Sequence, residues 1–198
     1  MGITGASGAP YAKRLLDVLV DADCEVGVCA SRAGVEVLAT ELYGDAGLPR
    51  GEVLDRFLGD AGASVRLYAA DDWSSPYASG SARVDAYVVC PCSMSTVGTL
   101  ASGAMSNLIH RAASVALKER RRLVLVPRET PLSAIHLRGL ATLNDAGAVI
   151  LFAAPGFYHG PETIDDLVDF VVARCLDQLG VENELVRRWG ADAERHVT

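Results

Sequence analysis

The sequence predicts an α/β domain built on a doubly wound, mostly parallel β-sheet. Along the 198 residues, short runs rich in β-branched side chains alternate with longer helical patterns, which is the rhythm of consecutive βαβ units. Several of the short runs are apolar throughout, as strands are when helices cover both faces of a sheet. A glycine-rich turn at residues 2–10 leads into the first helical pattern, as expected at a ligand-binding edge.

The elements follow one another without a linker, a repeat or a low-complexity tract. Because 50% of the residues are hydrophobic, we expect one packed domain over 1–198, with a C-terminal tail from about residue 180. Residues 1–4 leave room only for a short first strand, unless residues are missing before them, and 71–83 are predicted to be a surface excursion. Further strands are expected at 24–30, 64–68, 85–90, 122–127 and 148–153, and helices near 10–21, 32–42, 51–58, 95–102, 107–120, 132–145 and 163–179.

Charge and hydropathy argue against several classes of function. The net charge of -7 argues against a nucleic-acid partner. No apolar stretch reaches the ~18–20 residues of a membrane-spanning helix, and no basic segment precedes an apolar run as in a signal peptide. We therefore expect a cytoplasmic protein with no membrane partner.

The five cysteines do not form a recognisable redox or metal motif. An odd number outside a secreted context argues against a disulfide framework. Cys90 and Cys92 are separated only by Pro91, which is the spacing of neither a CxxC redox site nor a zinc pair. We expect buried free thiols near strand ends.

The glycine turn predicts an anion site. Gly2, Gly5 and Gly8 are spaced by three, so the turn is neither G-x-G-x-x-G nor a P-loop. Backbone N–H groups at the start of the following helix, together with the Ser7 hydroxyl, suit a phosphate. Ser31 stands where a dinucleotide site would place an acid for the ribose, so a mononucleotide is favoured. A tight turn without a ligand is the alternative.

A second polar loop follows the predicted strand at 85–90. Ser93, Ser95, Thr96 and Thr99 cluster where a strand ends and a helix begins, which is the ligand edge of an open α/β sheet. Hydroxyl and N–H groups there could hold a phosphate or ring carbonyls. The alternative is an ordinary N-cap with a polar turn, but one serine is enough for a cap.

Three segments carry a family resemblance. They are "GITGASGAPYAKRLL", "CPCSMSTVGTLASGAMSNLIHRAASVALKERRRLVLVPRETPLSAIHL" and "GAVILFAAPGFYHGPETIDDLVDFVVARCLDQLG", and they cover about half of the chain. In order and spacing they resemble the flavin prenyltransferases of the UbiX family, as does "RWG" at 188–190. Residues 43–84 match weakly apart from "DDW" and "SGS".

The resemblance implies a flavodoxin-like Rossmann fold, assembled as a dodecamer with active sites between subunits. It also implies binding of reduced FMN and dimethylallyl monophosphate. The five-carbon unit is joined to N5 and C6 of the flavin, and the prenylated FMN serves UbiD-type decarboxylases.

Site residues carry over from the family by position. Those implied to contact FMN are Gly5, Ala6, Ser7, Ser31, Ser93, Met94, Ser95, Thr96 and Arg128. Those implied around the substrate phosphate are Arg111, Lys118, Tyr158 and Arg174. Those implied to act in catalysis are Ser7, Glu41, Lys118, Glu129 and Trp189, with the two glutamates managing protons and the tryptophan closing on the site.

These residue types suit an allylic transfer. A departing phosphate needs fixed cations and hydrogen-bond donors, and the developing allyl cation needs a π face such as Trp189. Carboxylates can shuttle the protons that ring closure moves.

Arg174 lies in an otherwise apolar helix pattern, which favours a functional charge. The structural alternatives are a solvated helix end for Lys118, a surface position for Arg111, a helix terminus for Glu41, an ion pair with Arg128 for Glu129, and packing for Trp189.

The segment "DDLVD" at 165–169 is similar to the Asp-rich Mg²⁺-diphosphate motif of isoprenoid synthases. Those proteins are all-helical and use two such motifs. Thr163 and Asp166 instead predict a capping box at a helix start. We therefore predict no metal requirement and a monophosphate substrate.

Two other functions are considered. FMN-dependent cysteine decarboxylases share the architecture but carry a histidine in the early helical region and a "PASANT"-like loop; here the loop is "PCSMST" and the first histidine is His110. A non-catalytic FMN-binding partner of a decarboxylase would not need Arg111, Lys118, Tyr158 and Arg174 together.

Overall fold

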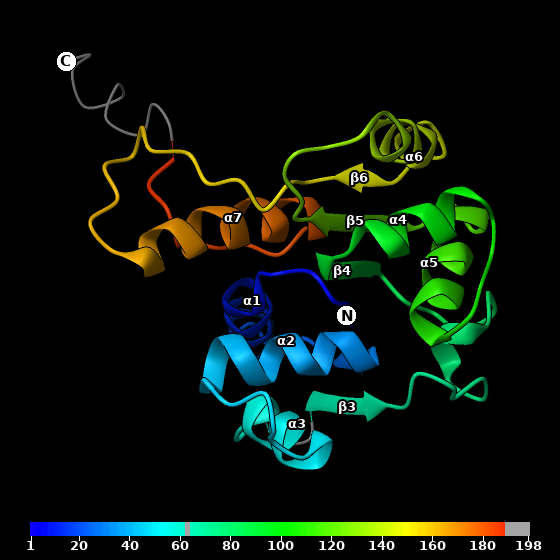
Figure 1. Ribbon diagram of the computed structural model, residues 1–198, viewed down its shortest axis with the longest axis horizontal. Coiled ribbons are helices and arrows are strands. Elements are labelled where there is room, and N and C mark those ends of the chain that lie inside the picture. The colour runs from blue at the N-terminus through cyan, green and yellow to red at the C-terminus, as the bar shows by residue number, and fades with distance from the viewer. Residues whose placement is uncertain (62–63, 189–198) are drawn as a thin grey trace.

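A single six-stranded parallel sheet organises the chain, in a computed structural model that describes residues 1–61 and 64–188. The strand order is β3-β2-β1-β4-β5-β6, and Figure 1 shows β3 on one side of the molecule and β4, β5 and β6 on the other. The order reverses direction between β1 and β4, so the predicted doubly wound sheet is confirmed and its switch point lies between those two strands. The strands are β1 (Gly2–Ile3), β2 (Val26–Ala30), β3 (Val65–Tyr68), β4 (Ala86–Cys92), β5 (Arg122–Pro127) and β6 (Val149–Ile150).

The predicted helices are also confirmed, within a few residues at each end. They are α1 (Ala9–Asp21), α2 (Arg32–Tyr43), α3 (Arg50–Leu58), α4 (Met94–Ala101), α5 (Leu108–Lys118), α6 (Ala134–Asp145) and α7 (Ile164–Leu179). In the described residues, no helix is both long and apolar enough to cross a bilayer.

Strand β6 is shorter than the predicted range 148–153. Leu151 N and Ala153 N still donate to Leu125 O and Pro127 O, at 2.9 and 3.0 Å. Pro127 has no N–H to donate in return, so the regular ladder stops while one-sided pairing continues. The prediction located the strand correctly but missed this break.

Two apolar cores lie on opposite faces of the sheet. Val124 and Val126 face a core with α1, α2, α3 and α7, whereas Leu123 and Leu125 face a second core with α4, α5 and α6. All four side chains are 0% exposed, as expected for strands covered on both faces. Helices α5 and α7 therefore lie on opposite faces of the sheet, as Figure 1 shows.

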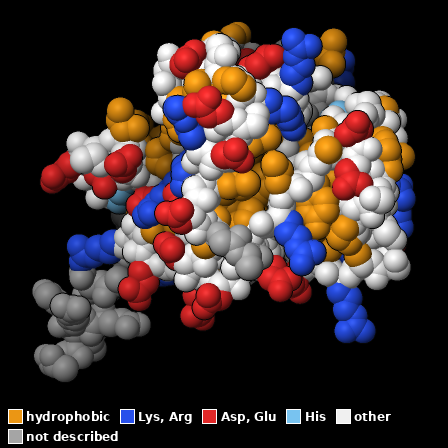
Figure 2. Space-filling view, turned by 90° about the horizontal axis from the view of Figure 1, so that it is seen from below, with side chains coloured by type: hydrophobic (Ala, Val, Ile, Leu, Met, Phe, Trp, Pro, Cys, Tyr) orange, Lys and Arg blue, Asp and Glu red, His pale blue; other side chains and the backbone are white. Residues whose placement is uncertain are grey.

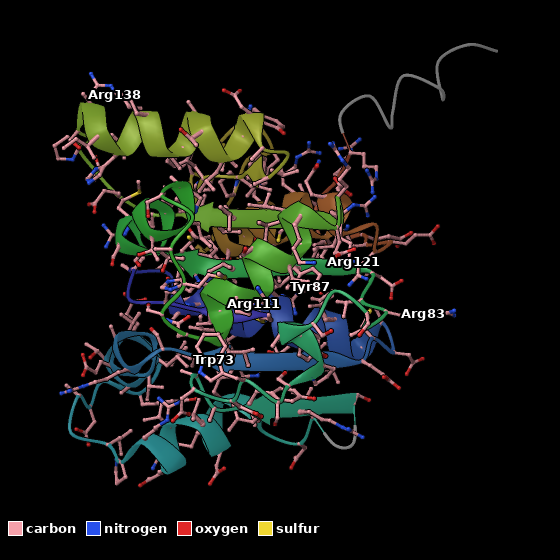
Figure 3. All side chains as sticks on the ribbon, turned by 90° about the vertical axis from the view of Figure 1, so that its right-hand side faces the viewer. Trp73, Arg83, Tyr87, Arg111, Arg121 and Arg138 are labelled. Carbon is pink, nitrogen blue, oxygen red and sulfur yellow. The ribbon has the colours of Figure 1, made fainter. Side chains whose placement is uncertain are left out.

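The stretch 71–83 is the predicted surface excursion, since most of its residues are exposed or half-buried, but it is anchored to the sheet. It contains a short 3-10 helix, η2 (Pro76–Ala78). The Tyr77 ring lies so close to β2 that a Cβ on Gly27 would be 2.2 Å from it. Arg111 Nε donates to Ala78 O at 2.8 Å and Arg121 Nη2 to Gly80 O at 2.7 Å, and both arginines lie on the side seen in Figure 3. These contacts join residues far apart in sequence, so no local pattern predicts them.

Strand β3 forms one edge of the sheet and is the least covered strand. Arg66 and Leu67 in its middle are exposed, Leu67 to 42%. Figure 2 views the molecule from this side, with hydrophobic side chains gathered in the middle of the face and charged side chains around them.

The predicted buried thiols are confirmed for Cys29, Cys90, Cys92 and Cys175, while Cys24 is half-buried. Burial raises the pKa of Cys29 to about 11, and that of Cys92 and Cys175 to about 12. Since the thiolate is the reactive form, we expect these three thiols to react slowly while the protein is folded.

Alkylation of the native protein at pH 8 is expected to modify Cys24 first. Iodoacetamide should add one group rapidly to the folded chain, and five after unfolding in guanidinium, because the other thiols are buried and protonated. Intact mass spectrometry at short reaction times measures this. Two or more rapid additions without denaturant would show that the sheet is more open than the structure indicates.

Candidate active site

The site lies at the carboxyl ends of β1 and β4, where ligands bind in doubly wound sheets. Thr4, directly after β1, joins the two loops. Its hydroxyl donates to Pro91 O at 3.0 Å and accepts from Ser93 N at 2.7 Å, and Thr4 N donates to Pro91 O at 3.1 Å. Thr4 is 3% exposed. The glycine turn and the 93–96 loop are therefore held as one unit.

The glycine turn is confined between β1 and α2. A Cβ on Gly5 would lie 2.5 Å from Ala33 Cβ, and one on Gly34 would lie 2.4 Å from Ile3 O. Only glycine allows this close approach. Gly8 has φ 135°, a backbone conformation that other residues rarely adopt. Ser7 is half-buried and Gly5 exposed, so the turn presents its outer side to solvent.

The Glu41 carboxylate occupies part of the predicted anion site. Gly8 N and Ala9 N, at the start of α1, both donate to Glu41 Oε2 at 2.8 Å. The expectation that these N–H groups are open to a phosphate is therefore wrong. Helix α1 has no side-chain cap of its own, and a carboxylate is a favourable partner for a helix N-terminus. Glu41 does not merely end α2, since it caps α1.

Loss of the Glu41 charge is expected to destabilise the fold moderately. In Glu41→Gln an amide oxygen replaces the carboxylate at the α1 N-terminus, so we expect a loss of about 1 kcal/mol in the free energy of unfolding. Urea denaturation measures it. Glu36→Gln is the control, because Glu36 on the same helix forms only an exposed pair with Arg32 and should cost about 0.3 kcal/mol. Equal effects would argue against the capping role.

The second polar loop combines a helix cap with exposed donors. Ser93 Oγ caps α4 by accepting from Thr96 N at 3.3 Å, and the two hydroxyls are 3.2 Å apart. Met94 and Thr96 are buried, whereas Ser95 is exposed. The capping alternative is thus correct for Ser93, and the remaining donors are the Ser95 hydroxyl and the amides of Met94 and Ser95, which have no intrahelical acceptor.

Residues at the ends of β2 and β5 flank these loops. Ser31 Oγ caps α2 by accepting from Gly34 N at 3.0 Å, and Ser31 N donates to Ile3 O at 2.9 Å. Arg128 and Glu129 follow β5 and are exposed. Glu129 Oε1 accepts from Thr130 N at 3.1 Å. Within the described residues Arg128 and Glu129 form no ion pair, so the predicted alternative role for Glu129 is not found.

The residues expected around the substrate phosphate form two separate pairs. Arg111 and Lys118 lie on α5, where Arg111 holds η2 and Lys118 pairs with Glu119. Tyr158 and Arg174 lie on the opposite face, where both line a cavity of about 310 Å³ beside α7. Since the sheet separates the pairs, one chain does not bring all four together.

Two further predicted residues remain. Ala6 is buried beside the glycine turn. Trp189 lies outside the described residues.

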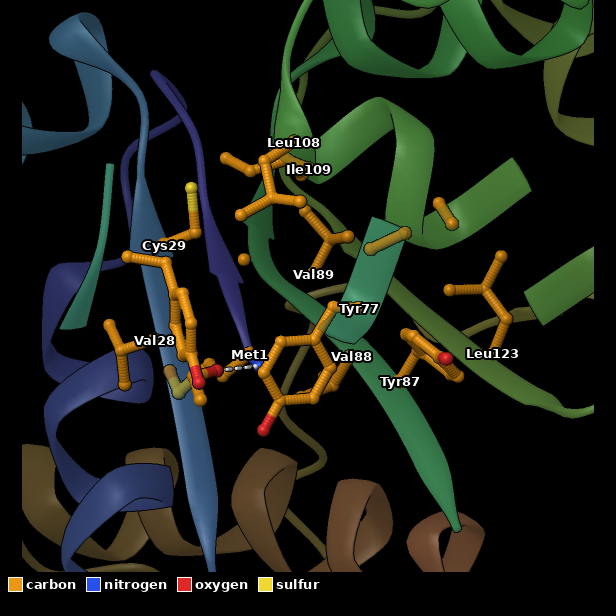
Figure 4. Close-up of a pocket in the computed structure, with 15 residues that line it drawn as sticks. Met1, Val28, Cys29, Tyr77, Tyr87, Val88, Val89, Leu108, Ile109 and Leu123 are labelled. Atoms are coloured by element: carbon orange, nitrogen blue, oxygen red, sulfur yellow. Dashed lines mark hydrogen bonds between the residues drawn. The ribbon is translucent and has the colours of Figure 1, made fainter. Parts of the chain in front are cut away.

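An apolar cavity under α5 does not belong to the site. It is lined by Tyr77, Tyr87 and Leu123 among others, has a volume of about 30 Å³, and is shown in Figure 4. The Met1 amino group donates to Gly27 O at 2.6 Å at its side. This volume suits one water molecule, not a nucleotide.

The acidic segment 165–169 has structural roles. Asp166 and Thr163 form the predicted capping box, with Asp166 Oδ2 accepting from Thr163 N at 2.8 Å. Asp169 accepts from Arg14 Nε and Nη2, at 2.6 and 3.0 Å, which joins α7 to α1. These carboxylates are therefore committed to contacts within the fold.

Thr4 is a site residue that was not predicted from the sequence. A threonine directly after a strand and before a glycine turn was the available signal, but its partners are 87 and 89 residues away. Asp177, which pairs with Arg174, was missed as well.

A doubly wound sheet with two amide-rich, uncharged loops at its switch point defines a nucleotide-binding α/β protein. A family model described as Flavoprotein matches residues 1–176, and the chain belongs to this family. Within it, the chain belongs with the UbiX flavin prenyltransferases. The flavin prenyltransferase UbiX of Pseudomonas aeruginosa is 50% identical over 202 residues, which cover 100% of this chain and 94% of the relative.

Solved structures agree with this assignment. A crystal structure of AnUbiX in complex with FMN and dimethylallyl pyrophosphate is similar with a TM-score of 0.83 and 38% identity, over 95% of this chain and 94% of that one. A dodecameric FMN-dependent UbiX-like decarboxylase from Escherichia coli O157:H7 has a TM-score of 0.82 and 39% identity, over 95% of this chain and 96% of that one.

Proposed function

We propose that this chain is a flavin prenyltransferase, which transfers a dimethylallyl group from dimethylallyl monophosphate to N5 and C6 of reduced FMN. The observation that carries the proposal is the switch-point edge of the sheet, where Thr4 fixes two loops rich in neutral donors beside Ser31. A switch point without an acid at the second strand end suits a mononucleotide. The names of the relatives support the same reaction.

The residues present fit FMN. In the described residues, the amides of Gly5 and Ser7 form no hydrogen bond, and the first amides of α4 lie on the loop that Thr4 joins to the glycine turn. These donors and the exposed Ser95 hydroxyl would hold the phosphate and the ring carbonyls of FMN. Arg128 at the end of β5 would lie against the flavin. When bound, reduced FMN supplies the nucleophilic atoms that accept the five-carbon unit.

Tyr158 and Arg174 would bind the phosphate of dimethylallyl monophosphate in the cavity beside α7. A guanidinium offers several directed donors to a phosphate oxygen, and the Tyr158 hydroxyl adds another. As the allylic C–O bond breaks, charge builds on the departing phosphate, and fixed donors stabilise it. Glu129, which is exposed after the end of β5, would take or return a proton. Ser7 in the glycine turn, Glu41, Lys118 and Trp189 complete the proposed catalytic set.

A second copy of the chain would complete the site, because the sheet separates Arg111 and Lys118 from Tyr158 and Arg174. We propose a homo-oligomer, as in the dodecameric relative, in which α5 of one copy faces α7 of another. The product would pass to a UbiD-type decarboxylase, and we place both reactions in the cytoplasm.

Anaerobic turnover tests the function. The purified protein is mixed with reduced FMN and dimethylallyl monophosphate in the presence of a chelator, and the mass of the released flavin is measured. A gain of one C₅H₈ unit is expected. Unmodified flavin would overturn the proposal, and release of CO₂ from a peptide with a C-terminal cysteine would favour the decarboxylase alternative.

Mixed oligomers test the shared site. Arg111→Ala and Arg174→Ala should each lose most activity alone, and co-expression of the two should restore part of it, because some sites then receive both intact arginines. Arg138→Ala, on the exposed side of α6, is the control. No restoration in an oligomer shown by light scattering to be mixed would argue against sites formed between copies.

A further inference from the structure

The Asp177 carboxylate near the end of α7 receives three side-chain donors. Arg174 Nη1 donates to its Oδ2 at 2.9 Å. Arg188 Nη2 and Asn183 Nδ2 donate to its Oδ1, at 3.1 and 3.3 Å. The Asp177 side chain is 20% exposed, so these charge-assisted bonds are partly shielded from water.

Asn183 and Arg188 both contact Asp177 because the chain reverses its direction after α7. Gly180 adopts a left-handed conformation, with φ 80°, and Val181 N donates to Leu176 O at 3.0 Å, which is a common way for a helix to end. Val181 and Leu185 then pack against the core of the α7 face. This packing returns Asn183 and Arg188 to the Asp177 carboxylate, so residues 181–188 lie along α7.

The same carboxylate lies at the wall of the cavity that holds the proposed phosphate subsite. Tyr158, Arg174, Asp177 and Arg188 all line this cavity of about 310 Å³. A guanidinium has five N–H donors, and Asp177 uses one from each of two arginines. The remaining donors can meet a phosphate while the long side chains stay fixed, which lowers the conformational entropy lost on binding.

We propose that Asp177 is a positioning residue: it holds Arg174 and Arg188 together at the wall of this cavity and fastens residues 181–188 to α7. The inference rests on the proposed function. The positioning role and the electrostatic field predict opposite effects on phosphate binding when the Asp177 charge is removed. Removing a negative charge beside a phosphate site should strengthen phosphate binding through the field, whereas loss of positioning should weaken it.

The test compares Asp177→Asn with the wild-type protein. We expect KM for dimethylallyl monophosphate to rise about tenfold and kcat to fall as well, because displaced donors hold the phosphate less well in the ground state and as its charge grows. Amide hydrogen exchange over 181–188 should become faster. Glu184→Gln removes one charge from the same segment and should change neither quantity. Asp177→Glu should recover part of the loss.

Two further measurements keep the outcome clear. Arg188→Gln keeps the Arg174–Asp177 pair, so exchange over 181–188 should rise as in Asp177→Asn while KM rises only about threefold. Calorimetric titration of dimethylallyl monophosphate measures binding without turnover. If wild-type protein makes no prenylated flavin but binds the phosphate more tightly than Asp177→Asn, the proposed function fails and the positioning role stands. Equal or tighter binding by Asp177→Asn would overturn the positioning role.

Discussion

Gly34→Ala is expected to lower the free energy of unfolding by about 3 kcal/mol, and the melting temperature by roughly 6–12 °C for a chain of this size. The added methyl would lie 2.4 Å from Ile3 O and 2.9 Å from Ile3 C. Both atoms belong to the central strand β1, which cannot move without disturbing its pairing with β2 and β4. Helix α2 must therefore move away from the sheet. The higher helix propensity of alanine, about 1 kcal/mol, offsets only part of the cost.

Gly98→Ala is the matched control for this change. Gly98 is also a helical glycine, in α4, but a Cβ there would meet nothing within 4 Å. We expect Gly98→Ala to stabilise the protein by roughly 0.5–1 kcal/mol. Thermal and urea unfolding of both variants measure the difference. If the two variants have the same stability, the close contact between α2 and β1 does not exist in solution.

Gly34 and Gly98 both lie in helices that the sequence predicts, but the sequence does not show which of the two contacts another element. Helices and strands were predictable because their signals are local: apolar runs for β4 and β5, and the Thr163–Asp166 capping box for α7. The close approach at Gly34 depends on Ile3, which belongs to another element. Local patterns do not show which glycine meets a backbone atom from elsewhere in the chain.

The candidate site was predictable to the same degree. The two polar loops were correctly placed at strand ends, since parallel strands bring their carboxyl ends to one edge. The Glu41 cap on α1 was not predictable, because Gly8 and Glu41 are 33 residues apart. The separation of Arg111 from Arg174 also follows only from the strand order and from the faces that α5 and α7 cover.

The contacts that the sequence does not predict are those that determine the shape of the site. The residue types predicted to bind a phosphate and a flavin are present, but their arrangement depends on residues such as Glu41 and Asp177 that bind other protein groups. One carboxylate occupies the start of α1 and the other holds two arginines. A preorganised site needs such supporting contacts as much as it needs the groups that touch the ligand.

Thr4→Val is expected to destabilise the protein by about 2–3 kcal/mol and to weaken FMN binding. Valine has nearly the same shape as threonine but leaves Ser93 N without its 2.7 Å acceptor. Pro91 O keeps only the bond from Thr4 N. A buried amide without a partner costs about 1–3 kcal/mol, and Thr4 is 3% exposed, so water cannot easily replace the hydroxyl.

Thr4→Ser separates the hydroxyl from the methyl group. It keeps both hydrogen bonds and should cost only about 1 kcal/mol, from the lost buried methyl. FMN affinity, measured by quenching of flavin fluorescence, should be close to wild type in Thr4→Ser and lower in Thr4→Val. The reason is geometric: the hydroxyl joins the glycine turn to the 93–96 loop, and a flavin held from both sides needs them at a fixed distance. Wild-type affinity in folded Thr4→Val would mean that each loop keeps its position without the other.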